Sequence, residues 1–497
     1  MPVKNIEHKF VVPNSVEVRD YQVNLANQAK GENSLVVLPT GLGKTVVALH
    51  VIADYLAKGT GGVLFLAPTK VLVNQHYEFL KSVLTIDDIA IITGEDLLAK
   101  RKKLWINSVI CATPEITRND IARKIVDTNQ FTLIVFDEAH RAVGDYAYVE
   151  IAGQLNRKDV RMIGMTATLP SEKEKAKKIC DNLHVRRLAE RNDSSPDVSP
   201  YIQETKTEWV MVDLTPEMKI IQRYIKLALD QRYTELRRNG LRLSDNKSLS
   251  QLLNARQFVL KRNIRSAKPL FTAIRITYAL NIFEAHGITP FLKFCDRTKS
   301  KKGAGIKELF ETDQNFTQAI ELAKNAQNNG FEHPKINKLV EILHKAESKV
   351  IIFSSYRDSV DVIQKKLVEM NISSEILIGK AGQTGLKQEK QIETVQKFRD
   401  GVTKALVATR VGEEGLDISE VNLVVFYDNV PSSIRFIQRK GRTGRKDTGR
   451  LVVLIAKDTI DEVYYWIGKR KVKSASNMSD NITKHLEKTE QVMDDFF

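Results

Sequence analysis

The chain has 497 residues, which is too long for a single hydrophobic core and predicts two to four domains. Its composition, 42% hydrophobic and 28% charged, is that of a globular protein, and no apolar run approaches the roughly 20 residues of a membrane helix. The three cysteines lie far apart, which argues against a zinc site and a disulfide framework, so a reducing cytoplasm is expected.

The positive charge of the chain is concentrated in its middle. The formal net charge is +15. Residues 219–302 hold 19 Lys and Arg against 5 Asp and Glu, whereas the rest of the chain is nearly balanced at 57 against 56. A charge that served only solubility would be spread out. The concentration therefore points to a polyanionic partner, most simply a nucleic-acid backbone.

Both ends of the chain alternate short apolar runs with helical patterns. The runs lack polar alternation, as strands of a parallel sheet covered on both faces do. In the first two hundred residues they predict strands at 34–38, 63–67, 108–112, 133–136 and 162–165. After residue 335 they predict strands at 350–353, 374–377, 405–408, 423–426 and 451–454. Because helical stretches separate the strands, each half is expected to consist of βαβ units.

The middle segment, from about residue 210 to 330, lacks a strong strand signal. Apolar residues at helical spacing predict one helix around residues 218–229, a second whose apolar face includes Leu252, Leu253, Phe258 and Leu260, and a third at 274–283. The predicted fold is α/β, with two parallel-sheet lobes and an inserted all-helical domain. The expected boundaries are 1–207 for the first lobe, 208–330 for the basic insertion, 331–474 for the second lobe and 475–497 for a polar tail.

A phosphate-binding loop is predicted between the first strand and the helix that follows it. The loop contains Thr40, Gly41, Leu42, Gly43, Lys44 and Thr45. Its glycines let backbone N–H groups point at an anion, and the helix N-terminus adds partial positive charge. Lys44 would reach the β- and γ-phosphates of ATP, and Thr45 would hold Mg²⁺. The general pattern has glycine at position 38, where this chain has Leu38.

Two adjacent carboxylates follow the strand at 133–136. Asp137 is placed to bind the Mg²⁺ shell, and Glu138 to polarise the attacking water; a divalent ion is a good reason to put two acids side by side. His140 is interpreted as coupling the nucleotide to lobe contacts, with local packing as the alternative. Thr166 and Thr168 follow another strand, and their hydroxyls could relay the state of the site.

A basic, glycine-rich stretch lies at residues 438–445, far from the phosphate loop in sequence. Arg442 and Arg445 are the cations expected to complete the ATP site from the second lobe, and Gln438 could position water. Such arginine fingers typically contribute a factor of roughly 10³–10⁵ in rate.

The order of these motifs resembles that of superfamily 2 helicases. More narrowly, residues 408–418, 424–428, 430–435 and 462–466 resemble the Hef group, archaeal fork-structure helicases related to the Fanconi anaemia M protein. The resemblance implies two RecA-like lobes that use ATP and Mg²⁺. It also implies that Arg19 and Gln22 read the adenine, and that Gly415 and Asp417 sense the nucleotide. Most Hef proteins carry a nuclease domain after the helicase, for which this chain is too short.

The same resemblance implies sequence-independent contacts with a nucleic-acid backbone. The residues expected to make them are Pro68, Thr69, Lys70, Thr93, Gly94, Thr113 and Pro114 in the first lobe, and Ser354, Ser355, Tyr356, Arg357, Thr409 and Arg410 in the second. In the insertion, Arg237, Arg238, Lys261 and Arg262 are expected to grip duplex, and these four are chosen by charge alone.

The sequence thus predicts an ATP-dependent helicase or translocase on forked or branched DNA, acting in replication-fork repair. By resemblance it would move 3′ to 5′. A nucleoid-associated monomer is expected, with no membrane contact and with replication or repair proteins as partners. Two alternatives stay open: an ATPase activated by duplex RNA, since RNA-sensing relatives share this layout, and a structure-specific DNA-binding scaffold with a vestigial ATPase.

Overall fold

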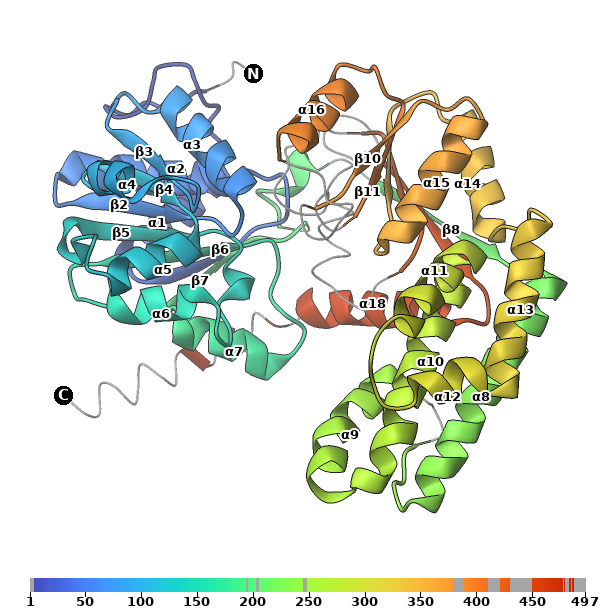
Figure 1. Cartoon of the computed structure of the whole chain (residues 1–497). Helices are drawn as coiled ribbons and strands as arrows, with labels where there is room; N and C mark the ends of the chain where they lie inside the picture. The colour runs from blue at the N-terminus through green and yellow to red at the C-terminus, as the bar shows by residue number, and fades with distance from the viewer. Residues whose placement is uncertain are drawn as a thin grey trace.

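The computed structural model describes residues 4–193, 195–202, 205–244, 248–379, 388–409, 421–429 and 449–476, together with 478, 482, 483, 485 and 486. Two α/β lobes lie side by side, and a helical domain extends from the second lobe (Figure 1). This arrangement confirms the predicted fold class.

The first lobe is built on a seven-stranded sheet in the order β3-β4-β2-β5-β6-β1-β7, and every recorded pairing is parallel. Its strands are β1 (Ser34–Val37), β2 (Gly62–Leu66), β3 (Ile89–Ile92), β4 (Val109–Ala112), β5 (Phe131–Phe136), β6 (Arg161–Thr166) and β7 (Arg187–Glu190). Alternate residues enter different cores: Val36 packs into one apolar cluster and Leu35 and Val37 into another. Burial of both faces explains why these strands read as unbroken apolar runs.

Helices cover both faces of this sheet, as Figure 1 shows. They are α1 (Asp20–Gly31), α2 (Lys44–Lys58), α3 (Lys70–Val83), α4 (Leu98–Leu104), α5 (Pro114–Ala122), α6 (Ala147–Gln154) and α7 (Lys173–Asn182). All five strands predicted for this lobe are present. Strands β3 and β7 were not predicted. Cys111, Cys180 and Cys295 are buried free thiols.

The second lobe has a six-stranded sheet in the order β10-β11-β9-β12-β13-β8, again with parallel pairings. Its strands are β8 (Thr205–Val212), β9 (Val350–Phe353), β10 (Ser374–Leu377), β11 (Ala405–Ala408), β12 (Leu423–Phe426) and β13 (Gly449–Ala456). Its helices include α14 (Pro334–Lys345), α15 (Arg357–Glu369), α16 (Gln388–Arg399) and α18 (Ile460–Ser476). The edge strand β8 precedes the insertion and was not predicted. The expected domain boundary at 207/208 therefore falls inside a strand of the second sheet.

The insertion is helical throughout its described part. It comprises α8 (Pro216–Arg238), α9 (Leu249–Arg262), α10 (Ala267–His286), α11 (Ile288–Lys299), α12 (Ile306–Glu311) and α13 (Gln314–Asn328). The apolar face expected for α9 is wrong in detail. The residues of α9 that enter the core are Leu252 and Val259, whereas Leu253, Phe258 and Leu260 are exposed.

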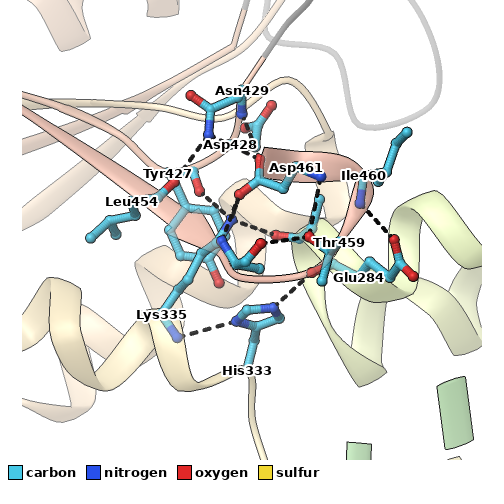
Figure 2. A network of polar contacts seen from close by, with 12 residues as sticks. Glu284, His333, Lys335, Tyr427, Asp428, Asn429, Leu454, Thr459, Ile460 and Asp461 are labelled. Carbon is cyan, nitrogen blue, oxygen red and sulfur yellow. Dashed lines mark hydrogen bonds and ion pairs between the residues drawn. The ribbon is translucent and has the colours of Figure 1, made fainter. Parts of the chain in front are cut away.

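A buried polar network joins the insertion to the second lobe (Figure 2). The Lys335 ammonium is fully buried, forms an ion pair with Asp461 at 2.6 Å, and donates to the carbonyl oxygens of Tyr427 (2.9 Å) and Ala285 (3.2 Å). The other Asp461 oxygen accepts from the Asn429 backbone N–H at 2.9 Å. One lysine thus links α10, α14, the end of β12 and the start of α18.

The C-terminal segment returns to the first lobe. In Figure 1, α18 crosses from the insertion toward α7, and Lys471 forms an ion pair with Glu172 at 3.1 Å. Met478, Ile482 and Leu486 are buried in an apolar cluster of the first lobe. The expected polar tail at 475–497 therefore includes apolar contacts. Among the described residues, no helix is both long and apolar enough to cross a bilayer.

Candidate nucleotide and nucleic-acid site

The phosphate loop joins β1 to α2, as predicted. Helix α2 begins at Lys44, and Gly43 before it has a left-handed backbone with φ 80° and ψ 45°. The backbone angle favours glycine here, and a Cβ would displace the side-chain amide of Gln22 from its place beside the loop. The N-terminus of a 15-residue helix thus faces the loop, where it favours an anion.

Gln22 supports this loop through its amide nitrogen, and its amide oxygen is buried without a hydrogen-bond partner among the described residues. Its Nε2 donates to the Leu42 carbonyl at 2.9 Å, and the Tyr21 hydroxyl donates to the same carbonyl at 2.8 Å. Because buried polar atoms are almost always paired, the Gln22 Oε1 fits a donor supplied by a ligand, such as the exocyclic amine of adenine. Arg19 lies beside it, with its guanidinium over the Tyr201 ring at 4.8 Å.

Lys44 follows the carboxyl end of β1 and the two carboxylates follow that of β5, with β6 between these strands. The Lys44 ammonium donates to the Leu38 carbonyl at 3.2 Å, at the start of the loop. Asp137 follows β5, and its backbone N–H donates to the Leu66 carbonyl of β2 at 2.8 Å. Glu138 has φ 49° and ψ 48°, a left-handed conformation that a non-glycine residue seldom adopts and that occurs often at functional sites.

Asp137 has a buried partner that the sequence did not reveal. The His76 Nε2 of α3 lies 2.9 Å from Asp137 Oδ2, and both side chains are buried. Burial alone would raise the pKa of Asp137, but the hydrogen bond and charge of His76, with the charge of Lys44, hold that pKa below its ordinary value. Asp137 is therefore a carboxylate, the form that binds a divalent cation.

His140 connects the carboxylates to the Thr-Ala-Thr segment. Its Nδ1 lies 3.2 Å from Glu138 Oε2 and 3.3 Å from Thr166 Oγ1. The Thr166 hydroxyl donates to the Thr168 carbonyl at 3.0 Å, so its oxygen is left to accept from Nδ1 of His140, whereas Glu138 Oε2 lies close to Nδ1 but has no hydrogen-bond partner among the described residues. The predicted relay residues are thus in contact. Leu38 N–H also donates to the Thr166 carbonyl, at 3.1 Å, which links the relay to the phosphate loop.

The other predicted loops of the first lobe lie along the same edge of its sheet. Residues 68–70 follow β2, residues 93–94 follow β3 and residues 113–114 follow β4. These three strands are adjacent, next to the strands that carry the nucleotide residues. One sheet edge therefore carries two neighbouring sets of loops, one predicted for nucleotide and the other for nucleic acid. Within the second set, Lys70 forms an ion pair with Glu95.

Comparison with known proteins places these features in a family. Residues 19–176 match the family model "DEAD/DEAH box helicase", and residues 334–447 match "Helicase conserved C-terminal domain". The chain is 35% identical over 97% of its length to a putative ATP-dependent RNA helicase of Methanocaldococcus jannaschii. It is 34% identical over 90% of its length to an ATP-dependent DNA helicase of Pyricularia oryzae.

A solved structure decides the assignment. The helicase domain of Hef from Pyrococcus furiosus is 36% identical, and the match covers 90% of this chain and 97% of that domain with a TM-score of 0.64. This chain belongs to the Hef-like helicase family. It spans 63% of the Methanocaldococcus relative and 44% of the Pyricularia relative, so the activities named for those whole proteins are not transferred here.

In this Hef-like chain, the second-lobe residues predicted to touch nucleic acid also follow strand ends, after β9 and β11. Ser354 is fully buried, and the Ser355 N–H donates to Asp428 at 2.7 Å. The Arg357 guanidinium donates to the Gly379 carbonyl at 2.9 Å, and the Tyr356 hydroxyl accepts from Arg297 of the insertion at 2.5 Å. The side chains of Tyr356 and Arg357 therefore make structural contacts, and Tyr356 ties the insertion to the second lobe.

The four basic residues chosen by charge gather at one end of the insertion. Arg237 and Arg238 end α8, Lys261 and Arg262 end α9, and all four are exposed. The residues that cap these two helices are joined, since Asn263 Nδ2 donates to the Asn239 carbonyl at 3.0 Å. Two cationic helix ends thus form one surface, which we call the basic tip.

The remaining predicted residues lie outside the part of the chain that the structure describes. They are Gln438, Arg442 and Arg445, the nucleotide-sensing Gly415 and Asp417, and Arg410. Their predicted neighbour Thr409 is described and is buried at the end of β11.

Proposed function

We propose that this chain is an ATP-driven motor that moves along and unwinds forked or branched DNA. The observation that carries the proposal is the convergence of Lys44, Asp137 and Thr166 at the carboxyl ends of β1, β5 and β6, beside strands whose end loops can hold a nucleic-acid backbone. Motors of this kind need nucleotide and track on one rigid edge, so that a change at one is felt at the other.

Each predicted nucleotide-site residue of the first lobe has a role in this mechanism. Gln22 accepts the adenine amine through its unpaired Oε1. The loop N–H groups and Lys44 would bind the phosphates, and Thr45 and Asp137 would hold Mg²⁺, which would supply positive charge to offset that of the phosphates. Glu138 orients the attacking water. His140 contacts both Glu138 and Thr166 through Nδ1, which couples water positioning to β6.

The second lobe would complete the site. Arg442 and Arg445 would stabilise charge on the transferred phosphoryl group, and Gly415 and Asp417 would sense which nucleotide is bound. The two lobes already meet at α3, because Val71 packs against the apolar cluster of the second sheet that contains Phe353 and Ala408. Closure around ATP would thus bring the predicted backbone contacts of both lobes onto one strand.

Two features favour branched DNA as the track. The backbone contacts predicted in the two lobes read no sequence, and the exposed basic tip of the insertion suits the phosphates of a duplex arm. ATP hydrolysis should therefore be stimulated more by forked DNA than by single strands, plain duplex DNA or duplex RNA. Stronger stimulation by duplex RNA would favour the RNA-activated ATPase instead.

Lys44→Ala separates a motor from a DNA-binding scaffold. The substitution removes the phosphate-binding ammonium but leaves both lobes folded, so hydrolysis and unwinding should be lost while fork binding is kept. Unwinding at the native rate by Lys44→Ala would refute the motor. Ordinary binding of forks by a native chain that hydrolyses no ATP would support the scaffold.

A further inference from the structure

An exposed aromatic surface lies where the edge strand β8 meets α18. Trp209 of β8 is 51% exposed and Trp466 of α18 is 46% exposed, although large aromatic side chains are usually buried. The ammonium of Lys469 lies over both rings, 4.8 Å from the Trp209 centroid and 5.3 Å from the Trp466 centroid. We call these three residues the tryptophan platform.

The two tryptophans of the platform are held in place by packing and by strand pairing. The buried Tyr465 ring packs edge-on against Trp466 at 5.0 Å and against Trp209 at 6.5 Å between centroids. Strand β8 is held along its whole length by β13, from Thr205 paired with Gly449 to Val212 paired with Ala456. Both indoles are therefore presented by regular elements, and they can meet a ligand without first being ordered.

Two exposed cations follow Trp466 along α18. Lys469 and Arg470 are both exposed, and α18 has no acidic residue after Glu462. On β8, the residues that alternate with Trp209 on its face are Thr205, Thr207 and Met211, all uncharged. A ligand that reaches the indoles therefore meets the positive charges of Lys469 and Arg470, while the acid one turn before Trp466, Glu462, accepts from the Asp458 N–H at 3.0 Å.

We propose that the tryptophan platform binds unpaired bases of a single-stranded nucleic acid, separately from the strand held by the two lobes. Bases stack on exposed aromatic rings whatever their identity, while nearby cations meet the phosphates. A protein partner fits less well, because lysine is depleted from the centre of protein interfaces and here an ammonium lies between the two rings. At a fork, the unpaired strand released by the motor would be such a ligand.

The chain offers a direct optical test, because it has three tryptophans and the third, Trp105, is 2% exposed. An oligonucleotide of twenty thymidines, added without nucleotide to the full chain, should quench tryptophan fluorescence. In the Trp209→Phe/Trp466→Phe variant only Trp105 emits, and this signal should stay unchanged. Equal fractional quenching in that variant would overturn the proposal, since the signal would then not come from the platform.

Affinity gives the second measurement. Trp209→Ala should weaken binding of the labelled oligonucleotide about tenfold by anisotropy, whereas Trp209→Phe, which keeps a stacking ring, should stay within about twofold. Thermal unfolding of both variants checks that β8 remains paired. Native affinity of a folded Trp209→Ala/Trp466→Ala variant would overturn the proposal and leave a protein partner as the occupant. ATP hydrolysis by these variants tests the motor separately, because no platform residue belongs to the nucleotide site.

Discussion

At the scale of single residues, Gln22 has the most specific expected effect. Its buried Oε1 accepts from an adenine amine but would oppose the carbonyl oxygen that guanine carries at the same position. Gln22→Ala should therefore raise the KM for ATP by about 5- to 100-fold, the effect of one lost or unsatisfied buried hydrogen bond. The preference for ATP over GTP should disappear, which steady-state hydrolysis of both nucleotides would measure.

Tyr21→Phe is the matched control for Gln22. Tyr21 and Gln22 both donate to the Leu42 carbonyl, but only Gln22 has the unpaired acceptor. If Gln22 reads the base, Tyr21→Phe keeps the preference for ATP even when the loop is loosened. Loss of discrimination in both variants would mean that Gln22 acts only by holding the loop.

His76 is expected to position a metal ligand. Its ring lies 4.4 Å from that of Phe65, which fixes it, and its Nε2 holds Asp137 in one orientation. Outer partners of metal ligands typically contribute about 10- to 100-fold in metal affinity. His76→Ala should thus shift the Mg²⁺ dependence of fluorescent ATP-analogue binding about tenfold upward. His76→Gln, whose amide can still donate to Asp137, should recover part of the loss; an unshifted Mg²⁺ curve in folded His76→Ala would contradict the role.

At the scale of elements, the sequence was informative where burial is uniform. All ten predicted strands are present. Most are buried along nearly their whole length and therefore read as apolar runs, whereas the edge strand β10 is partly buried and contains Ser374 and Glu375. Strand β8 was not predicted because it is an exposed edge strand with polar residues in its first half; its sequence is Thr-Lys-Thr-Glu-Trp-Val-Met-Val. Its partner β13 also lies far along the chain. His76 was missed for a similar reason: nothing local to α3 marks it, and its importance comes from contact with Asp137.

The junction of α10, α14 and α18 contains a group that makes stability depend on pH. His333 accepts from the Lys335 N–H through Nδ1 at 3.1 Å and donates through Nε2 to the Glu284 carbonyl at 3.0 Å, so its ring is neutral. Burial, followed by the charge of Lys335, lowers the pKa of His333 from 6.5 to about 3. Between these values the unfolded chain binds a proton that the folded chain does not, so stability is complete above pH 6.5 and falls as the pH drops toward 3.

This loss should amount to about 2 kcal/mol between pH 6.5 and pH 5, at about 1.4 kcal/mol per pH unit. His333→Gln can make the same two hydrogen bonds without titrating, so urea unfolding of that variant should lose correspondingly less stability on acidification. His344→Gln, exposed on the same helix, should behave as the native chain does. Identical pH dependence of the unfolding free energy in His333→Gln and the native chain would show that protonation of His333 does not destabilise the folded state.

At the scale of the whole molecule, the insertion is joined to the second lobe more firmly than the lobes are to each other. Besides the Lys335 network, Arg297 of α11 donates to both oxygens of Asp358 in α15 at 3.0 and 2.6 Å. The contacts between the lobes named above are fewer and partly exposed, such as the ion pair of Lys471 with Glu172. We therefore expect the insertion to move with the second lobe, so that closure around ATP swings the basic tip relative to the first lobe.

The basic tip yields a prediction about salt. Changing Arg237, Arg238, Lys261 and Arg262 together to Gln should weaken fork binding and reduce the slope of log Kd against log salt by up to about 3.6, since each of the four lost phosphate contacts removes about 0.9. The matched control changes four exposed cations of the first lobe to Gln. They are Lys102, Lys103, Arg123 and Lys124, near the C-terminal ends of α4 and α5 and away from the predicted nucleic-acid loops. The net charge of this control is the same, so a general loss of attraction would affect both variants equally. A slope that stays native in the tip variant would mean that the tip does not touch phosphate, whereas a selective change would place a duplex arm against the body that closure moves, the second lobe with its insertion.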